Sequence, residues 1–398
     1  MRITVLATLL ALAPSPGAAQ ISDEIGRTGL GPTEARLAAL ATPSDADRFA
    51  LGGVRFLRAV ERSLQLRWQV GLTDQMQMLP FLRLPLAENP APQPFDPDMI
   101  ATLFRDVSAG MDGAREPLSA ISDTSDFGLE IALADLWFDV NANGARDAGE
   151  DMLEIAGPMI LGWRWLDRDP ATPAPVIRFD VADAAWLSAY THLLGGIGDV
   201  VLAYDPTAAI AKTLEAKIAM QTLRSTPPDI FAMDQSFGEF VDMAAIVLDT
   251  LNQTPDAARA TSAHAHFLAM VADNRRFWAQ VATETDNDAE WLPNDAQQSA
   301  LGIVVPPGTG PAWLAVLDDA EALLTGARLA PYWRLDAKAG INVGAMFTDA
   351  RPIDVAGWVQ GVDALPYMQR GQVVDAASWT AFESLMAGEA MLFTLFLN

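Results

Sequence analysis

The sequence predicts a mainly α-helical fold, built as a bundle or a solenoid-like array, with one inserted polar loop and a small β-hairpin near the C-terminus. Three observations predict it. Apolar residues recur mostly at helical spacing, helix start and stop signals flank these stretches, and strand signals are few. The repeated alternation of strand and helix patterns that a large parallel sheet requires is missing from the sequence.

The helix signals are clearest in the middle of the chain. Asp205-Pro206 is typical of an N-cap followed by the first helical residue, and apolar residues then recur at Ile210, Leu214 and Ile218. Thr254-Pro255 opens a second helix in the same way. Further helices are expected over 33–41, 46–71, 97–121, 181–203, 235–252, 311–326 and 376–392.

Strands are expected at two places only. Residues 175–179 form one short strand, and residues 332–335 and 341–347 form a hairpin across an Asp- and Gly-containing turn. Proline-rich connections suggest a division of the chain into 20–170, 171–305 and 306–398, after a leader of residues 1–19. One large helical domain that contains all three regions is the alternative.

The first residues have the pattern of a secretory signal peptide. Arg2 is the only charged residue before Asp23, an apolar stretch follows it, and Gly17-Ala18-Ala19 supplies small residues for cleavage before Gln20. The apolar stretch and all later ones are shorter than the roughly 20 residues that a membrane-spanning helix needs. We therefore expect a periplasmic or secreted protein with no transmembrane segment in the mature chain.

Composition excludes several classes of function. The chain has no cysteine, which rules out thiol catalysis, iron–sulfur clusters and cysteine-ligated zinc. Its formal net charge of −25 at pH 7 repels nucleic acid, so no nucleic-acid partner is expected, and the same charge attracts cations. The 11 tryptophans are interpreted as core anchors, and the sequence names no protein or glycan partner.

One short segment carries a recognisable metal-binding pattern. Between Asp139 and Glu150, oxygen-bearing side chains fall at positions 1, 3, 5, 9 and 12, and glycine falls at position 6. This pattern resembles the calcium loop of EF-hand proteins and of bacterial extracellular relatives such as dockerins. The resemblance covers residues 139–150 only. It implies that Ca²⁺, which takes about six to eight oxygen ligands, is held there. The implied ligands are Asp139, Asn141, Asn143, the Ala145 carbonyl, Asp147 (directly or through water) and Glu150.

The loop departs from the EF-hand pattern in two ways. Position 8 is Arg146, where a paired EF-hand has an aliphatic residue that contacts its twin loop, and no second full loop occurs in the sequence. Asn rather than Asp stands at positions 3 and 5, so the expected dissociation constant is on the order of 10⁻⁴ to 10⁻³ M. We expect a structural Ca²⁺ site rather than a sensor. The alternative is an ordinary Asn/Gly turn without an ion.

No other motif assigns a chemistry. The acidic residues between Thr283 and Glu290 are interpreted as a solvated helix end or a capped loop, the alternative being a second cation site. His264 and His266 are expected to point to different faces of one helix. The leading hypothesis is an exported, calcium-stabilised periplasmic binding or accessory protein. The alternative is an exported hydrolase or carbohydrate-active enzyme that uses buried carboxylates. A pocket with facing carboxylates, or a histidine beside a serine, would favour the enzyme.

Overall fold

The computed structural model confirms a mainly helical fold with a small antiparallel β-element near the C-terminus. It describes residues 16–73, 81–161, 165, 169, 172–223, 232–285, 289–387 and 394. Most of the predicted leader, residues 1–15, lies outside the described residues. The predicted cleavage point falls within the first helix, and Ile21 and Ile25 beyond it are buried.

The N-terminal part of the structure combines five helices with a two-stranded sheet. Its elements are α1 (Pro16–Thr28), α2 (Leu30–Ala38), α3 (Asp45–Gln69), α4 (Asp98–Leu118), β1 (Leu129–Ala132), η1 (Leu133–Asp135), α5 (Met152–Leu161) and β2 (Val176–Phe179). Strands β1 and β2 are antiparallel, with Leu129 opposite Phe179. Because β1 and β2 lie on either side of residue 170, the predicted boundary there runs between two strands of one sheet.

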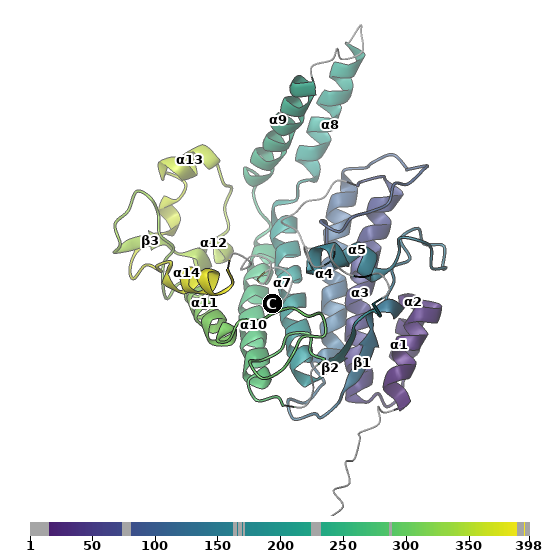
Figure 1. The fold of residues 1–398 in the computed structure, drawn as a ribbon. Helices are drawn as coiled ribbons and strands as arrows, with labels where there is room; N and C mark the ends of the chain where they lie inside the picture. Colours follow the sequence, from purple (N-terminus) through teal and green to yellow (C-terminus); the bar gives the residue numbers. More distant parts are fainter. Residues whose placement is uncertain are drawn as a thin grey trace, which may run out of the picture.

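Four helices follow in the middle of the chain: α7 (Val181–Tyr204), α8 (Thr207–Thr222), α9 (Ala232–Leu251) and α10 (Ala257–Val281). The long helices α3, α4, α7 and α10 pack in that order, each against the next, and α8 and α9 project beyond them as a helical hairpin (Figure 1). The start of α10 shifts to Ala257 because the Asp256 carboxylate accepts the backbone N–H groups of Ala258 and Arg259.

The C-terminal part is a smaller lobe beside α10 (Figure 1). It contains α11 (Thr309–Leu324), β3 (Ala339–Ile341), α12 (Val343–Thr348), α13 (Val355–Gln360), η2 (Leu365–Tyr367), β4 (Met368–Arg370) and α14 (Ala377–Leu385). The predicted helix 376–392 is confirmed up to Leu385, and its last residues lie outside the described part of the chain.

The strands of the C-terminal β-element differ from the prediction. β3 pairs with β4, so Ile341 lies opposite Met368 rather than in a hairpin with residues 332–335. Residues 343–348 are helical because the Asn342 side chain accepts the Ala345 backbone N–H and caps α12. Tyr332 packs instead in a small apolar cluster with Ile341, Ala364 and Tyr367.

The main core extends from Ile21 to Met386 and includes buried residues of α1 to α5, α7, α10, α11 and α14. Among the described residues, no single helix is both long and apolar enough to cross a membrane. Helices α7 and α8 meet that criterion only together, as a pair bent by 59°.

Candidate functional site: an oxygen-lined loop

The predicted calcium loop, residues 139–150, joins the end of the β1–η1 segment to helix α5. Its two ends meet in a short antiparallel bridge, in which Phe138 N–H donates to the Glu150 carbonyl at 2.9 Å and Met152 N–H donates to the Leu136 carbonyl at 3.0 Å. Helix α5 begins at Met152, two residues after the loop ends. Before the loop, helical backbone is limited to the three residues of η1, because the bridge holds the following residues extended.

The backbone of the loop curls around the Asp139 carboxylate. Its two oxygens accept the backbone N–H groups of Asn143 and Gly144, both at 2.9 Å. Gly144 has φ +76° and Ala142 has φ +57°, so two residues of this curl occupy the left-handed region. A β-carbon at Gly144 would meet no atom within 4 Å. Glycine is therefore favoured there by the positive φ angle and not by steric crowding.

Three side chains meet on the inner side of this curl. The amide nitrogens of Asn141 and Asn143 donate to one oxygen of Asp147, at 2.8 and 2.7 Å. These two hydrogen bonds lower the pKa of the Asp147 carboxyl. The amide oxygen of Asn143 accepts the Ala145 N–H at 2.7 Å. The side chains at positions 3, 5 and 9 are thus in contact with one another.

The Glu150 side chain connects the beginning of the loop to its end. Only 4% of this residue is exposed, and its carboxylate accepts the backbone N–H groups of Val140 and Asp147, both at 2.8 Å. A buried carboxylate therefore joins the first and last turns of the loop.

The donor set of the loop is composed of oxygens, which hard cations such as Ca²⁺ prefer. Three carboxylates and two amides belong to the set, and turning an Asn amide by half a rotation exchanges its nitrogen for its oxygen. The carboxylates of Asp139, Asp147 and Glu150 are not among the described groups whose ligand atoms all lie within 4.8 Å of one another. The loop residues fit Ca²⁺ best if Asp147 binds through water, as position 9 often does.

Two side chains of α3 hydrogen-bond the backbone of Asp139, the first residue of the loop. Glu61 accepts the Asp139 backbone N–H at 2.9 Å, and Gln65 donates to the Asp139 carbonyl at 2.7 Å. Both side chains come from one face of α3, four residues apart. Sequence reasoning missed them, since nothing in the sequence connects this helical pair to a loop more than 70 residues away.

Arg146, the unusual residue at position 8, turns back to its own loop. Its guanidinium donates to the Ala134 carbonyl at 2.8 Å and pairs with Asp151 next to the bridge. Arg146 thus links the two ends of its own loop.

A second acidic cluster lies at the N-terminus of α7. One carboxylate oxygen each of Asp180, Glu284 and Glu290 lie within 4.8 Å of one another. The expectation of a solvated helix end for residues 283–290 is wrong for Glu290, which is 2% exposed and accepts a hydrogen bond from Gln297. Burial and the neighbouring Asp180 charge raise the pKa of Asp183 well above its usual value. The cluster thus places three carboxylate oxygens, ligands that hard cations prefer, close together.

The histidines lie where helices α7 and α10 meet. His192 and His266 contact each other through their Nδ1 atoms at 2.9 Å, whereas His264 points away and stacks on Phe347. The expectation that His264 and His266 point to different faces is confirmed. Ser188 lies one turn from His192, but its hydroxyl donates to Asp273. This serine is therefore not arranged as a nucleophile whose proton a histidine removes.

Comparison of the chain with protein-family models, with curated proteins and with solved structures finds no match. Its function is therefore argued from its own residues.

Proposed function

We propose that this chain is an exported calcium-binding protein, in which one Ca²⁺ in the loop Asp139–Glu150 has a structural role, and that it acts as a periplasmic binding or accessory protein. The observation that carries the proposal is the contact of the Asn141 and Asn143 side chains with the Asp147 carboxylate, at three of the predicted ligand positions. The signal-peptide pattern and the charge of −25 support export and cation binding.

A structural role is favoured over sensing by the surroundings of the loop. Sensor EF-hands act in pairs and open a groove between helices when Ca²⁺ binds. Here Arg146 links the two ends of the loop, and Glu61 and Gln65 of α3 hydrogen-bond its first residue. A cation in this loop would stabilise the connection between α3 and α5 rather than separate two helices.

The test is thermal unfolding of the chain from Gln20 onward, in EDTA and in about 10 mM CaCl₂. With the expected dissociation constant on the order of 10⁻⁴ to 10⁻³ M, linkage predicts a gain of about 1.5–2.5 kcal/mol in the free energy of unfolding. MgCl₂ at the same concentration should give a smaller gain, because Mg²⁺ demands stricter geometry and keeps its waters.

Two variants make the test specific. Glu150→Gln should abolish the Ca²⁺-dependent gain, whatever its effect on stability in EDTA. Glu154→Gln, an exposed change on α5 just outside the loop, should retain the full gain. Equal melting temperatures with and without Ca²⁺ in the unmodified chain would show that the loop is an Asn/Gly turn without an ion.

A further inference from the structure

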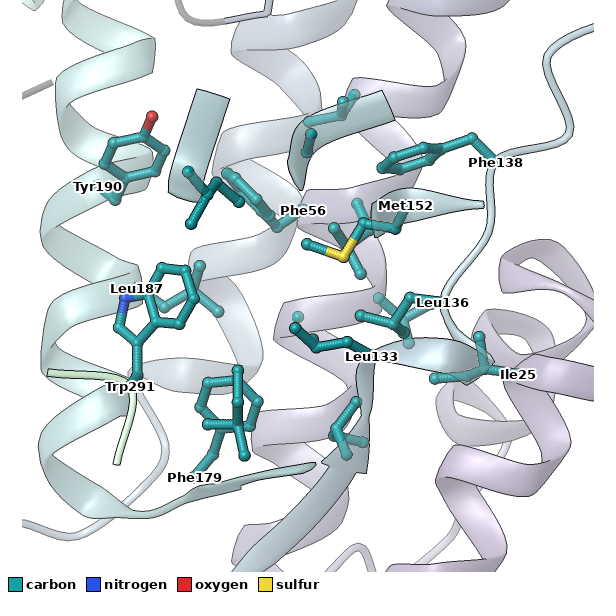
Figure 2. Close-up of a pocket in the computed structure, with 18 of the residues that line it drawn as sticks. Ile25, Phe56, Leu133, Leu136, Phe138, Met152, Phe179, Leu187, Tyr190 and Trp291 are labelled. Carbon is teal, nitrogen blue, oxygen red and sulfur yellow. The ribbon is translucent and has the colours of Figure 1, made fainter. Parts of the chain in front are cut away.

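The core of the N-terminal part contains a large apolar cavity. Its volume is about 220 Å³, and it lies between α3, α5, α7 and the β1–β2 sheet. Side chains such as Phe56, Phe138, Phe179 and Leu187 surround the hollow (Figure 2). Apolar cavities of about 150 Å³ already admit benzene. Protein interiors are otherwise packed as densely as organic crystals, so a hollow of this size indicates space for a ligand.

On the side of α5, flexible methionine side chains form the wall of the cavity. Met152 and Met159 of α5 line it, and methionine side chains reshape easily around different contents. The lining residues Leu57 of α3 and Ile160 of α5 are only partly buried, so the hollow approaches the surface at these two helices. A ligand would have a short path inward there.

The cavity has one polar side, which faces α7. Arg83 lines it with only 3% of its surface exposed, and its guanidinium hydrogen-bonds the hydroxyl of Tyr190. Burial lowers the pKa of Arg83 to about 10, so the side chain is still cationic at neutral pH. The indole N–H of Trp291, also in the lining and 7% exposed, has no hydrogen-bond acceptor within the described residues. In Figure 2, Tyr190 and Trp291 both lie along the α7 side of the hollow, and the indole nitrogen of Trp291 is turned away from its centre.

We propose that this cavity binds a ligand of the fatty-acid class, with one aliphatic chain in the hollow and its carboxylate at Arg83 and Tyr190. An arginine can bind a carboxylate through two parallel hydrogen bonds, which are strongest where water is excluded. The apolar lining excludes a strongly polar ligand such as a sugar. This inference gives the binding role a substrate class and does not depend on Ca²⁺ in the loop.

The test is calorimetric titration of the delipidated chain with laurate, dodecanol and dodecyltrimethylammonium, all below their micellar concentrations. Laurate should bind at least tenfold more tightly than dodecanol, and the cationic amphiphile should not bind. Equal affinity for laurate and dodecanol would overturn the assignment of the carboxylate. Vesicles of phosphatidylglycerol form a separate arm, and binding to them without binding of laurate would overturn the single-chain ligand.

Two pairs of variants locate the site. A β-carbon added at Gly53 of α3, which lines the cavity, meets no atom within 4 Å, so Gly53→Leu should fill the hollow and keep the fold. It should weaken laurate binding more than tenfold, whereas Gly238→Leu, with equally open space on the projecting helix α9, should not. Full laurate affinity in Gly53→Leu would overturn the location.

Arg83→Met should reduce the affinity for laurate to about that for dodecanol, and it should reduce the affinity for dodecanol far less. Arg351→Met, at an exposed ion pair, is the control and should change neither affinity. Because Arg83 is buried, Tyr190→Phe provides a milder variant with the same expected direction. Undiminished preference for laurate in both Arg83→Met and Tyr190→Phe would contradict the proposed carboxylate site.

Discussion

The Glu61 side chain of α3 accepts the backbone N–H of Asp139, the first residue of the oxygen-lined loop, at 2.9 Å. Four residues later, Gln65 donates to the carbonyl of the same Asp139. Helix α3 also lines the apolar cavity, through Phe56 and Val60 among others. The same helix therefore positions the first residue of the loop and forms one wall of the cavity, so the two candidate sites share a structural element.

We expect Glu61→Ala to be strongly destabilising. Glu61 is 1% exposed and pairs with both Arg58 and the Asp139 N–H, so its loss leaves buried polar groups without their partner. Losses of this kind cost about 3–5 kcal/mol. Urea unfolding measured in EDTA separates this effect from any effect of Ca²⁺.

Glu116→Ala is the matched control for Glu61→Ala. Glu116 also pairs with an arginine of α3, Arg55, but its side chain is 76% exposed. Removing an exposed pair should cost less than about 1 kcal/mol. Similar losses in the two variants would contradict the anchoring role of Glu61.

Three residues of the loop, Ala142, Gly144 and Gly149, lie in the left-handed region, and substitutions at the first two should have opposite effects. Gly144→Ala should destabilise the chain by about 1–2 kcal/mol, because φ +76° is unfavourable for a residue with a β-carbon. Ala142→Gly should stabilise it by up to about 1 kcal/mol, since Ala142 already bears this strain at φ +57°. Thermal unfolding in EDTA measures both, and effects of the same sign would show that the loop is not held in this conformation.

Local signals in the sequence were sufficient for the long helices. The capping boxes Ser44–Asp47 and Asp180–Asp183 start α3 and α7 through hydrogen bonds that span three residues. Apolar residues at helical spacing then predict the rest of each helix. The calcium-binding pattern could be recognised for the same reason, because all the ligands that it predicts lie in one short segment.

Contacts between distant residues were not predictable in this way. The pairing of Ile341 with Met368 was missed because an apolar stretch near residue 343 fits a strand as well as a short helix. The contact between Glu61 and Asp139 joins residues 78 positions apart. The cavity is a volume left between packed elements, and composition or periodicity carries no signal for unfilled space.

Adjacent glycines in α3 should respond differently to the same substitution. A β-carbon at Gly52 would lie 2.7 Å from the Leu118 side chain of α4, whereas one at Gly53 meets open space. Gly52→Ala should therefore cost about 1–3 kcal/mol through overpacking. Gly53→Ala should gain about 0.5–1 kcal/mol from helix propensity. Chemical denaturation of both variants tests the close packing of α3 on α4, and a neutral Gly52→Ala would contradict it.

The paired histidines of α7 and α10 predict a loss of stability in acid. Burial, followed by the charge of Arg115, lowers the pKa of His192 from 6.5 to about 3. The unfolded chain therefore binds a proton at His192 below about pH 6.5, and the folded chain does not until about pH 3. The contribution of His192 to stability is present above pH 6.5 and declines as the pH falls through this window. Urea unfolding of the unmodified chain and of His192→Gln at pH 7.5 and 5.0 measures the effect. The variant should lose less stability between these two pH values, and an equal loss would show that His192 does not stay neutral in the folded state.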